Sequence, residues 1–176
     1  MSTRLLSEVI DEIQTGNLLA FRVRRFNSFV SLVLKLYQKV TRAKYSHVGV
    51  VLRIHDRVFI VEAVTPKVVI TPLDKVDDFY LIPAKPKASL RSQEDFLLGK
   101  VGVNYSLIDI LTHFLGMDYS KDSIYCSELV SEFYNHVGYL TERESGHTPD
   151  KICIAVKTKI GISESIYVVT DRGNLK

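Results

Sequence analysis

Hydrophobic residues recur at two different spacings along this chain. Residues 2–15 carry large apolar side chains three to four positions apart, which predicts a helix that Gly16 would end. Between residues 45 and 82, runs rich in β-branched residues predict strands instead. Helical spacing returns from residue 89. Helices, then a meander of strands, then helices again predict an α+β fold with an antiparallel sheet.

Turn and capping residues divide these regions into individual elements. A first strand is expected at 17–23, and a second helix at 27–41. The expected central strands cover residues 45–54, 57–64, 68–71 and 79–82, and the first two form a hairpin about His55 and Asp56. The later helices are expected to begin at residues 89, 106, 126 and 148, and a last strand at 166–170 precedes a frayed tail, 171–176. A single domain over 1–176 is expected.

The composition is that of an ordinary globular domain. Hydrophobic residues make up 46% of the chain, charged residues make up 24%, and the net charge of +3 gives no indication of nucleic-acid binding. The two cysteines lie too far apart in sequence to form a disulfide framework, which favours a reducing compartment. No signal peptide and no apolar run of roughly 20 residues is visible. A cytoplasmic protein is therefore expected.

Cys126 is the first candidate for chemistry. It opens a segment in which Leu129, Val130, Phe133 and Val137 recur at helical spacing. A thiol at the start of a helix lies beside free N–H groups and the positive end of the dipole, and both stabilise the nucleophilic thiolate. The alternative is that Cys126 is a small buried apolar residue, as most free cysteines are.

His47 and Glu62 are the candidate partners of this thiol. His47 begins an apolar strand, so it would be held rigidly enough to act as a base for Cys126. Glu62 is a carboxylate within another apolar strand, and in the expected hairpin it lies within a residue or two of His47. A buried carboxylate needs a partner, which His47 would supply. Each residue also has a structural alternative. His47 could be a hydrogen-bonded histidine at the edge of a strand, and Glu62 could face solvent on an edge strand.

Together these segments resemble the permuted branch of the NlpC/P60 superfamily. The resemblance rests on Tyr-Ser-His-Val-Gly-Val-Val at 45–51, Val-Glu-Ala at 61–63 and Tyr-Cys-Ser-Glu-Leu at 125–129. It is supported by Thr-Gly-Asn-Leu-Leu-Ala-Phe at 15–21, Gly-Lys-Val-Gly-Val-Asn-Tyr-Ser at 99–106 and Thr-Pro-Asp at 148–150. That branch includes the YiiX/YebB-like proteins and is related to lecithin:retinol acyltransferase-like enzymes. The match covers about residues 14–170. Asn17, Val103 and Asn104 depart from the family pattern.

The resemblance implies a circularly permuted papain-like fold, in which the histidine strand precedes the cysteine helix. It implies a catalytic triad of Cys126, His47 and Glu62. The expected activity is that of a cysteine-dependent hydrolase or acyltransferase, which would act on an amide or ester through a thioester on Cys126. Tyr125 and Tyr45 are expected to line the pocket or bind the oxyanion, although a structural role is the alternative for both. A non-catalytic binding or adaptor module on the same fold is the other functional class.

Cofactors and metals are not expected. Cys126, His136, His147 and Cys153 follow one another in an order that matches no compact zinc pattern. The stretch from Arg24 to Lys44 is basic and free of acidic residues, and it surrounds an apolar helix. Such a helix is expected either to contact an anionic membrane peripherally or to expose a solvated polar face. Peptide and lipid substrates therefore both remain open.

Overall fold

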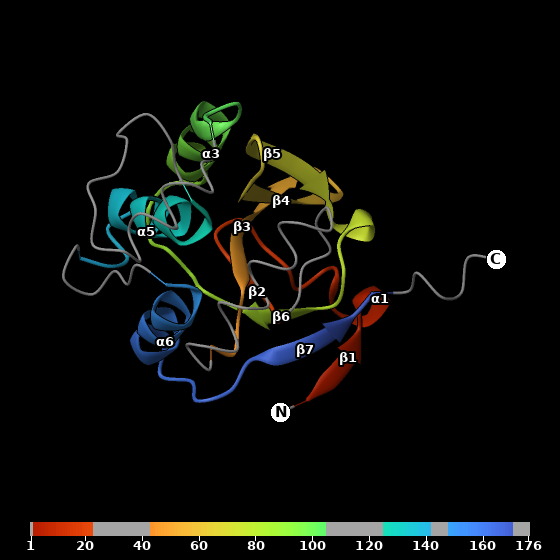
Figure 1. The fold of residues 1–176 in the computed structure, drawn as a ribbon. Helices are drawn as coiled ribbons and strands as arrows, with labels where there is room; N and C mark the ends of the chain where they lie inside the picture. Colours follow the sequence, from red (N-terminus) through yellow and green to blue (C-terminus); the bar gives the residue numbers. More distant parts are fainter. Residues whose placement is uncertain (1, 23–42, 105–124, 142–147, 171–176) are drawn as a thin grey trace.

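The structure is a computed structural model, and it describes residues 2–22, 43–104, 125–141 and 148–170. These residues form a seven-stranded sheet with strand order β1-β7-β6-β2-β3-β4-β5 (Figure 1). The strands are β1 (Thr3–Leu5), β2 (Leu18–Phe21), β3 (His47–Ile54), β4 (Arg57–Val64), β5 (Lys67–Pro72), β6 (Phe79–Ile82) and β7 (Ile166–Val169). The helices are α1 (Leu6–Val9), α3 (Leu90–Lys100), α5 (Cys126–His136) and α6 (Pro149–Ile160), with a 3₁₀ turn, η1 (Leu73–Lys75).

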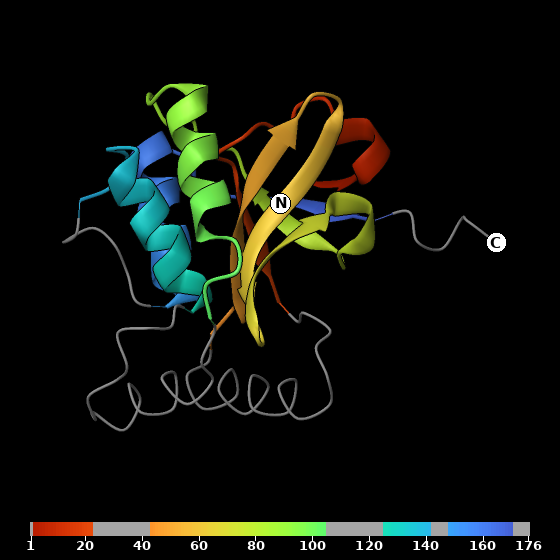
Figure 2. The same ribbon diagram turned by 90° about the horizontal axis from the view of Figure 1, so that it is seen from above.

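Side chains on the two faces of the sheet belong to two separate hydrophobic clusters. Alternate residues along a strand point to opposite faces, so Val48 and Val50 differ from Val51 in the side they cover. The first cluster packs under α3, α5 and α6, and the second packs under α1 and η1. Figure 2 shows these two sets of helices on opposite sides of the sheet. The expected α+β fold is confirmed.

Most of the expected strand and helix ends are also confirmed. The hairpin β3–β4 turns at His55, whose φ of 53° is left-handed, and Ile54 pairs with Arg57. The Ser89 hydroxyl accepts a hydrogen bond from Ser92 N at the start of α3. The last expected helix begins with the Thr148 cap and Pro149, and it ends at Gly161, with a φ of 71°.

The helix expected at residues 2–15 is wrong in its extent. Residues Thr3–Leu5 are a strand that pairs in parallel with β7, Thr3 with Tyr167 and Leu5 with Val169, and only Leu6–Val9 is helical. The apolar stripe is nevertheless used, since Val9 and Ile13 are fully buried. The strand expected from residue 45 begins instead at His47. The helices expected at 27–41 and from 106, and the tail 171–176, lie outside the described residues.

Candidate active site

The site lies where the first residue of β3 meets the first residue of α5. His47 begins β3, between β2 and β4 in the sheet, and Cys126 begins α5, which packs against β3 and β4. Helix α5 is held there by its apolar side, with Leu129, Val130 and Phe133 all fully buried. The His47 and Cys126 side chains are both buried, with exposed fractions of 2% and 6%. A fixed helix and a central strand thus hold the two groups.

Glu62 holds one nitrogen of the His47 ring. The distance from His47 Nε2 to Glu62 Oε2 is 2.9 Å, and the Glu62 side chain is 1% exposed. The strand register explains the contact. Val50 of β3 pairs with Val61 of β4, and since the strands are antiparallel, Glu62 lies beside Gly49, two residues from His47. A carboxylate this deeply buried would be strongly destabilising without such a partner.

Cys126 interacts with the same ring. Burial alone would lower the pKa of His47, but the charge and hydrogen bond of Cys126 and those of Glu62 outweigh burial and raise that pKa to about 9. Because Glu62 occupies Nε2, Nδ1 is the ring nitrogen that remains for the Cys126 sulfur. At neutral pH an imidazolium in this position stabilises a thiolate beside it, together with the helix dipole of α5.

Thr71 is a member of this cluster that the sequence did not indicate. Its hydroxyl donates a hydrogen bond of 2.7 Å to Glu62 Oε1, the carboxylate oxygen that does not contact His47. Thr71 lies on β5, where its Cα pairs with Ile60, while Glu62 pairs with Val69. A threonine in a β-strand is common for packing reasons alone, so its spacing from Glu62 carried no recognisable signal.

The two tyrosines expected to line the pocket occupy different places. Tyr125 is the residue before α5, where its backbone N–H donates to Glu128 Oε2 at 3.4 Å. It therefore lies next to Cys126. Tyr45 is 2% exposed, its hydroxyl lies 3.3 Å from Ser165 Oγ, and its ring packs edge-on against Tyr80 at 5.2 Å. These contacts account for Tyr45 as a packing residue.

The segment that precedes His47 is anchored through its backbone. Asp150, in the first turn of α6, accepts hydrogen bonds from Lys44 N at 2.8 Å and Tyr45 N at 3.0 Å. Ser46 donates its hydroxyl to Arg22 O at 3.0 Å, and its N–H bonds Phe21 O at 2.9 Å. Helix α6 and the end of β2 therefore fix the chain directly before the histidine.

Gly49 is required by close packing between β3 and β4. A Cβ built there would lie 2.6 Å from Ile60 Cδ1 and 2.9 Å from the Val61 carbonyl oxygen. Real Cβ atoms do not approach backbone oxygens so closely, so a larger residue would push β4 away. The displaced part of β4 would be the part that carries Glu62.

Asn17, one of the departures from the family pattern, lies away from His47. Asn17 precedes β2 at the end remote from Phe21, which pairs with His47. Its amide donates to Ala84 O at 2.8 Å and its oxygen accepts from Gln14 N at 2.9 Å, a pair of bonds that aspartate would not make in full. Asn104 bridges to Lys67 at the start of β5.

The second cysteine has a different environment from Cys126. Cys153 on α6 is 1% exposed, and burial raises the pKa of its thiol above the ordinary value. Within the part of the chain that the structure describes, no three His, Cys, Asp or Glu side chains converge as metal ligands. His147, which was compared with zinc ligand patterns in the sequence, lies outside that part.

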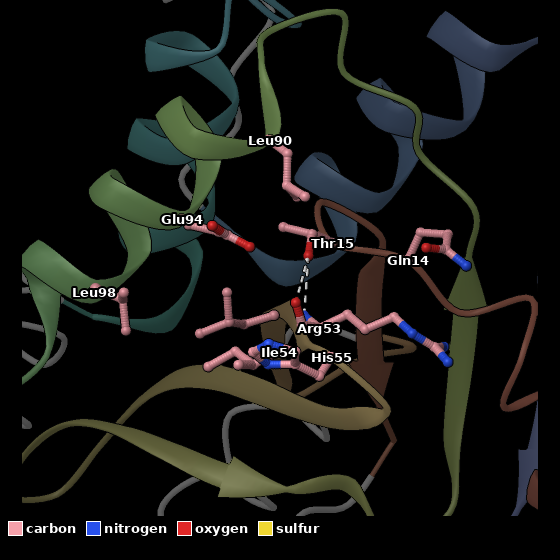
Figure 3. A pocket seen from close by; sticks show the side chains of 9 residues that line it. Gln14, Thr15, Arg53, Ile54, His55, Leu90, Glu94 and Leu98 are labelled. Atoms are coloured by element: carbon pink, nitrogen blue, oxygen red, sulfur yellow. Dashed lines mark hydrogen bonds between the residues drawn. The ribbon is translucent and has the colours of Figure 1, made fainter.

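A pocket of about 540 Å³ lies at the other end of β3 from His47. Ile54 and His55 of the β3–β4 hairpin form one wall, and Leu90 and Leu98 of α3 form the other (Figure 3). The Thr15 hydroxyl, which also lines the pocket, accepts a hydrogen bond of 3.0 Å from Arg53 N of β3. Cys126 is not among the residues that line it, so this pocket is separate from the candidate active site.

The basic segment expected to contact a membrane falls largely on residues 23–42, outside the described residues. Of the described helices, none has the length and the hydropathy that crossing a membrane requires.

Comparison with known proteins agrees with this fold. The chain resembles the crystal structure described as metalloprotein yiiX from Escherichia coli O157:H7, with a TM-score of 0.53 and 21% identity over 91% of this chain and 90% of that one. This likeness shows the shared fold. No curated protein matches. A family model described as the permuted papain-like amidase enzymes of the YaeF/YiiX, C92 family matches residues 27–149. The chain therefore belongs to the C92 family of permuted papain-like amidases.

Proposed function

We propose that this protein is a thiol hydrolase that cleaves an amide through a thioester on Cys126, with His47 as the acid–base group and Glu62 as its orienting partner. The observation that carries the proposal is the buried His47 ring held between Cys126 and Glu62, with its pKa raised to about 9. This arrangement supplies a nucleophile, a base and a group that fixes the base, which are the parts that cysteine-dependent acyl transfer needs.

In the first half of the reaction, the Cys126 thiolate attacks the substrate carbonyl carbon and forms a C–S bond. The carbonyl oxygen takes the charge, and the Cys126 backbone N–H at the start of α5 is a suitable donor because a first-turn N–H makes no helical hydrogen bond. As the C–N bond breaks, the His47 imidazolium gives its proton to the leaving amine.

In the second half, His47 takes a proton from water, and the resulting hydroxide attacks the thioester carbon. The C–S bond then breaks and releases a carboxylic acid and the Cys126 thiolate. Glu62 holds Nε2–H throughout, so Nδ1 is the nitrogen that exchanges the proton.

Hydrolysis is proposed ahead of acyl transfer because the family is described as amidases. Transfer to an acceptor other than water would use the same thioester. We also propose that the chain is related to the NlpC/P60 and lecithin:retinol acyltransferase-like enzymes. We further propose that its substrate is of the peptide or lipid type and that Arg24–Lys44 contacts a membrane peripherally.

Alkylation followed by intact mass tests the thiol. Wild type, Cys126→Ala and His47→Gln are treated with iodoacetamide at about pH 6 and about pH 8. His47→Gln is chosen because an amide still donates to Glu62, which leaves no buried carboxylate unpaired. We expect one fast adduct in wild type at about pH 6, and none in Cys126→Ala, because the buried Cys153 remains a thiol.

The role of His47 is decided in the same experiment. We expect His47→Gln to slow the fast adduct by at least about tenfold at pH 6, since it loses the imidazolium that stabilises the thiolate. If the adduct forms slowly in wild type and is unaffected by His47→Gln, Cys126 is an ordinary thiol. The non-catalytic binding module then replaces the hydrolase.

A further inference from the structure

The Thr71 side chain hydrogen-bonds the carboxylate that orients His47. Its hydroxyl donates to Glu62 Oε1 at 2.7 Å, while Oε2 accepts from His47 Nε2 at 2.9 Å. Each oxygen of this buried carboxylate therefore has its own partner. We propose that Thr71 is a positioning residue, which fixes the rotation of the Glu62 carboxylate and through it the orientation and tautomer of His47. This inference rests on the proposed function.

The sheet register makes Thr71 suited to this task. Glu62 pairs with Val69 and Ile60 pairs with Thr71, so the two side chains are diagonal neighbours on one face of β4 and β5. Threonine is β-branched and has few allowed rotamers in a strand, so the hydroxyl direction is set by the backbone of β5. The position of β5 is itself fixed on its outer side by hydrogen bonds from Val68 N to Val103 O and from Gly102 N to Val68 O.

Loss of the hydroxyl would leave Oε1 buried without this donor. A buried carboxylate oxygen in that state turns toward another donor, because an unsatisfied buried acceptor is costly. Rotation about the last side-chain bond of Glu62 also moves Oε2, which then no longer holds Nε2–H. The imidazolium would then lose part of the contact with Glu62 that favours it over the neutral ring, and the neutral ring would be free to carry its proton on Nδ1, the nitrogen that must accept the proton of Cys126.

The test compares Thr71→Val, which keeps the shape and removes the hydroxyl, with Thr71→Ser, which keeps the hydroxyl. The measured quantity is the rate constant of Cys126 alkylation as a function of pH. We expect Thr71→Val to slow alkylation at about pH 6 by about 3- to 10-fold, the effect of one net hydrogen bond. We expect Thr71→Ser to stay within about twofold of wild type. Ile70→Val is the matched control for loosened packing of β5, because residue 70 faces the other side of the sheet.

A double-mutant cycle with Glu62→Ala shows whether Thr71 acts through the carboxylate. In Glu62→Ala there is nothing for Thr71 to hold, so adding Thr71→Val should cause no further slowing. Nitrogen chemical shifts of His47, recorded above about pH 9.5 where the ring is neutral, supply a second readout, and we expect Thr71→Val to move them toward the Nδ1–H tautomer while Ile70→Val leaves them unchanged. If Thr71→Val is too unstable, Thr71→Ala is compared with Thr71→Ser in its place.

Three outcomes are distinguished. If His47→Gln slows alkylation and Thr71→Val does not, the proposed function stands and the role of Thr71 is overturned. If Thr71→Val slows alkylation equally with and without Glu62, Thr71 does not act through the carboxylate, and the inference is wrong. If His47→Gln has no effect on alkylation, the proposed function and the inference fail together.

Discussion

At the scale of single residues, the raised pKa of His47 has a consequence for stability. The folded-state pKa of about 9 lies above the ordinary value of 6.5, so the protonated form is favoured by folding. Its contribution to the free energy of unfolding is complete below about pH 6.5, and it is lost as the pH rises through about 9.

We therefore expect wild type to lose stability between about pH 6.5 and about pH 9.5 more steeply than His47→Gln, which has no group to titrate at this position. Denaturant unfolding of both proteins across this range measures the difference. Parallel curves would contradict the raised pKa. The comparison uses no substrate, so it tests the electrostatics of the site separately from its chemistry.

Two glycines give opposite predictions for the same substitution. Gly49→Ala would bring a Cβ to within 2.6 Å of Ile60, so we expect a loss of about 1–3 kcal/mol in the free energy of unfolding. Gly99 lies in α3 with no atom within 4 Å of the built Cβ, so Gly99→Ala should stabilise by about 0.5–1 kcal/mol through helix propensity. Thermal or denaturant unfolding checks both. We also expect only Gly49→Ala to slow Cys126 alkylation.

At the scale of elements, α6 holds the chain in front of β3. The Asp150 carboxylate accepts from two successive backbone N–H groups, those of Lys44 and Tyr45. Thr148, by contrast, uses its side chain to cap α6, where its hydroxyl accepts a hydrogen bond from Lys151 N. Substitutions at Asp150 and Thr148 can therefore distinguish an effect on the stability of α6 from an effect on the position of the strand that carries His47.

We expect Asp150→Ala to cost about 1–3 kcal/mol, because two backbone donors lose a charged acceptor, and to slow Cys126 alkylation. Thr148→Ala should cost about 1 kcal/mol, as other lost caps do, and leave alkylation unchanged. Unfolding and alkylation are measured on both variants. Equal alkylation rates in the two variants would show that the Asp150 contact does not position His47.

Elements with a strong local signal could be predicted from the sequence. The hairpin β3–β4 and helix α5 follow from β-branched runs, a two-residue turn and an apolar stripe, and Glu62 could be placed near His47 from the hairpin alone. Strand β1 could not, because its three residues are held by backbone pairing with β7, about 160 positions later, while their own spacing is helical. Thr71 could not either, because its role depends on the register of a third strand.

At the scale of the whole molecule, the candidate site uses both faces of the sheet. Cys126 belongs to the apolar cluster under α3, α5 and α6, whereas Glu62 alternates with Val61 and Ala63 of that cluster and so points to the face under α1 and η1. The order of the strands explains why the fold class could be predicted and its edge could not. Strands β3, β4 and β5 follow one another in sequence and lie side by side, while the edge formed by β1 and β7 joins the first strand to the last.

Because β1 and β7 are neighbours at that edge, the two ends of the chain could be joined and the chain opened at another position. Thr3 pairs with Tyr167 and Leu5 with Val169, so strand spacing puts Thr3 and Val169 roughly 8 Å apart. Because β1 and β7 run parallel, a linker from Thr170 to Ser2 must run back along the strand pair, so about a dozen residues would be needed to close the chain into a ring. Opening the ring between Lys87 and Ala88, in the segment between β6 and α3, gives a protein in which the cysteine helix precedes the histidine strand.

We expect such a rearranged gene product to fold and to keep the fast alkylation of Cys126 at about pH 6, because each contact of His47 is retained. Circular dichroism and the alkylation assay measure this. A folded product with an unreactive Cys126 would show that the cut strains the site. A circular permutation of the gene therefore requires chain ends that lie near each other rather than new contacts, and the pairing of β1 with β7 brings the ends together.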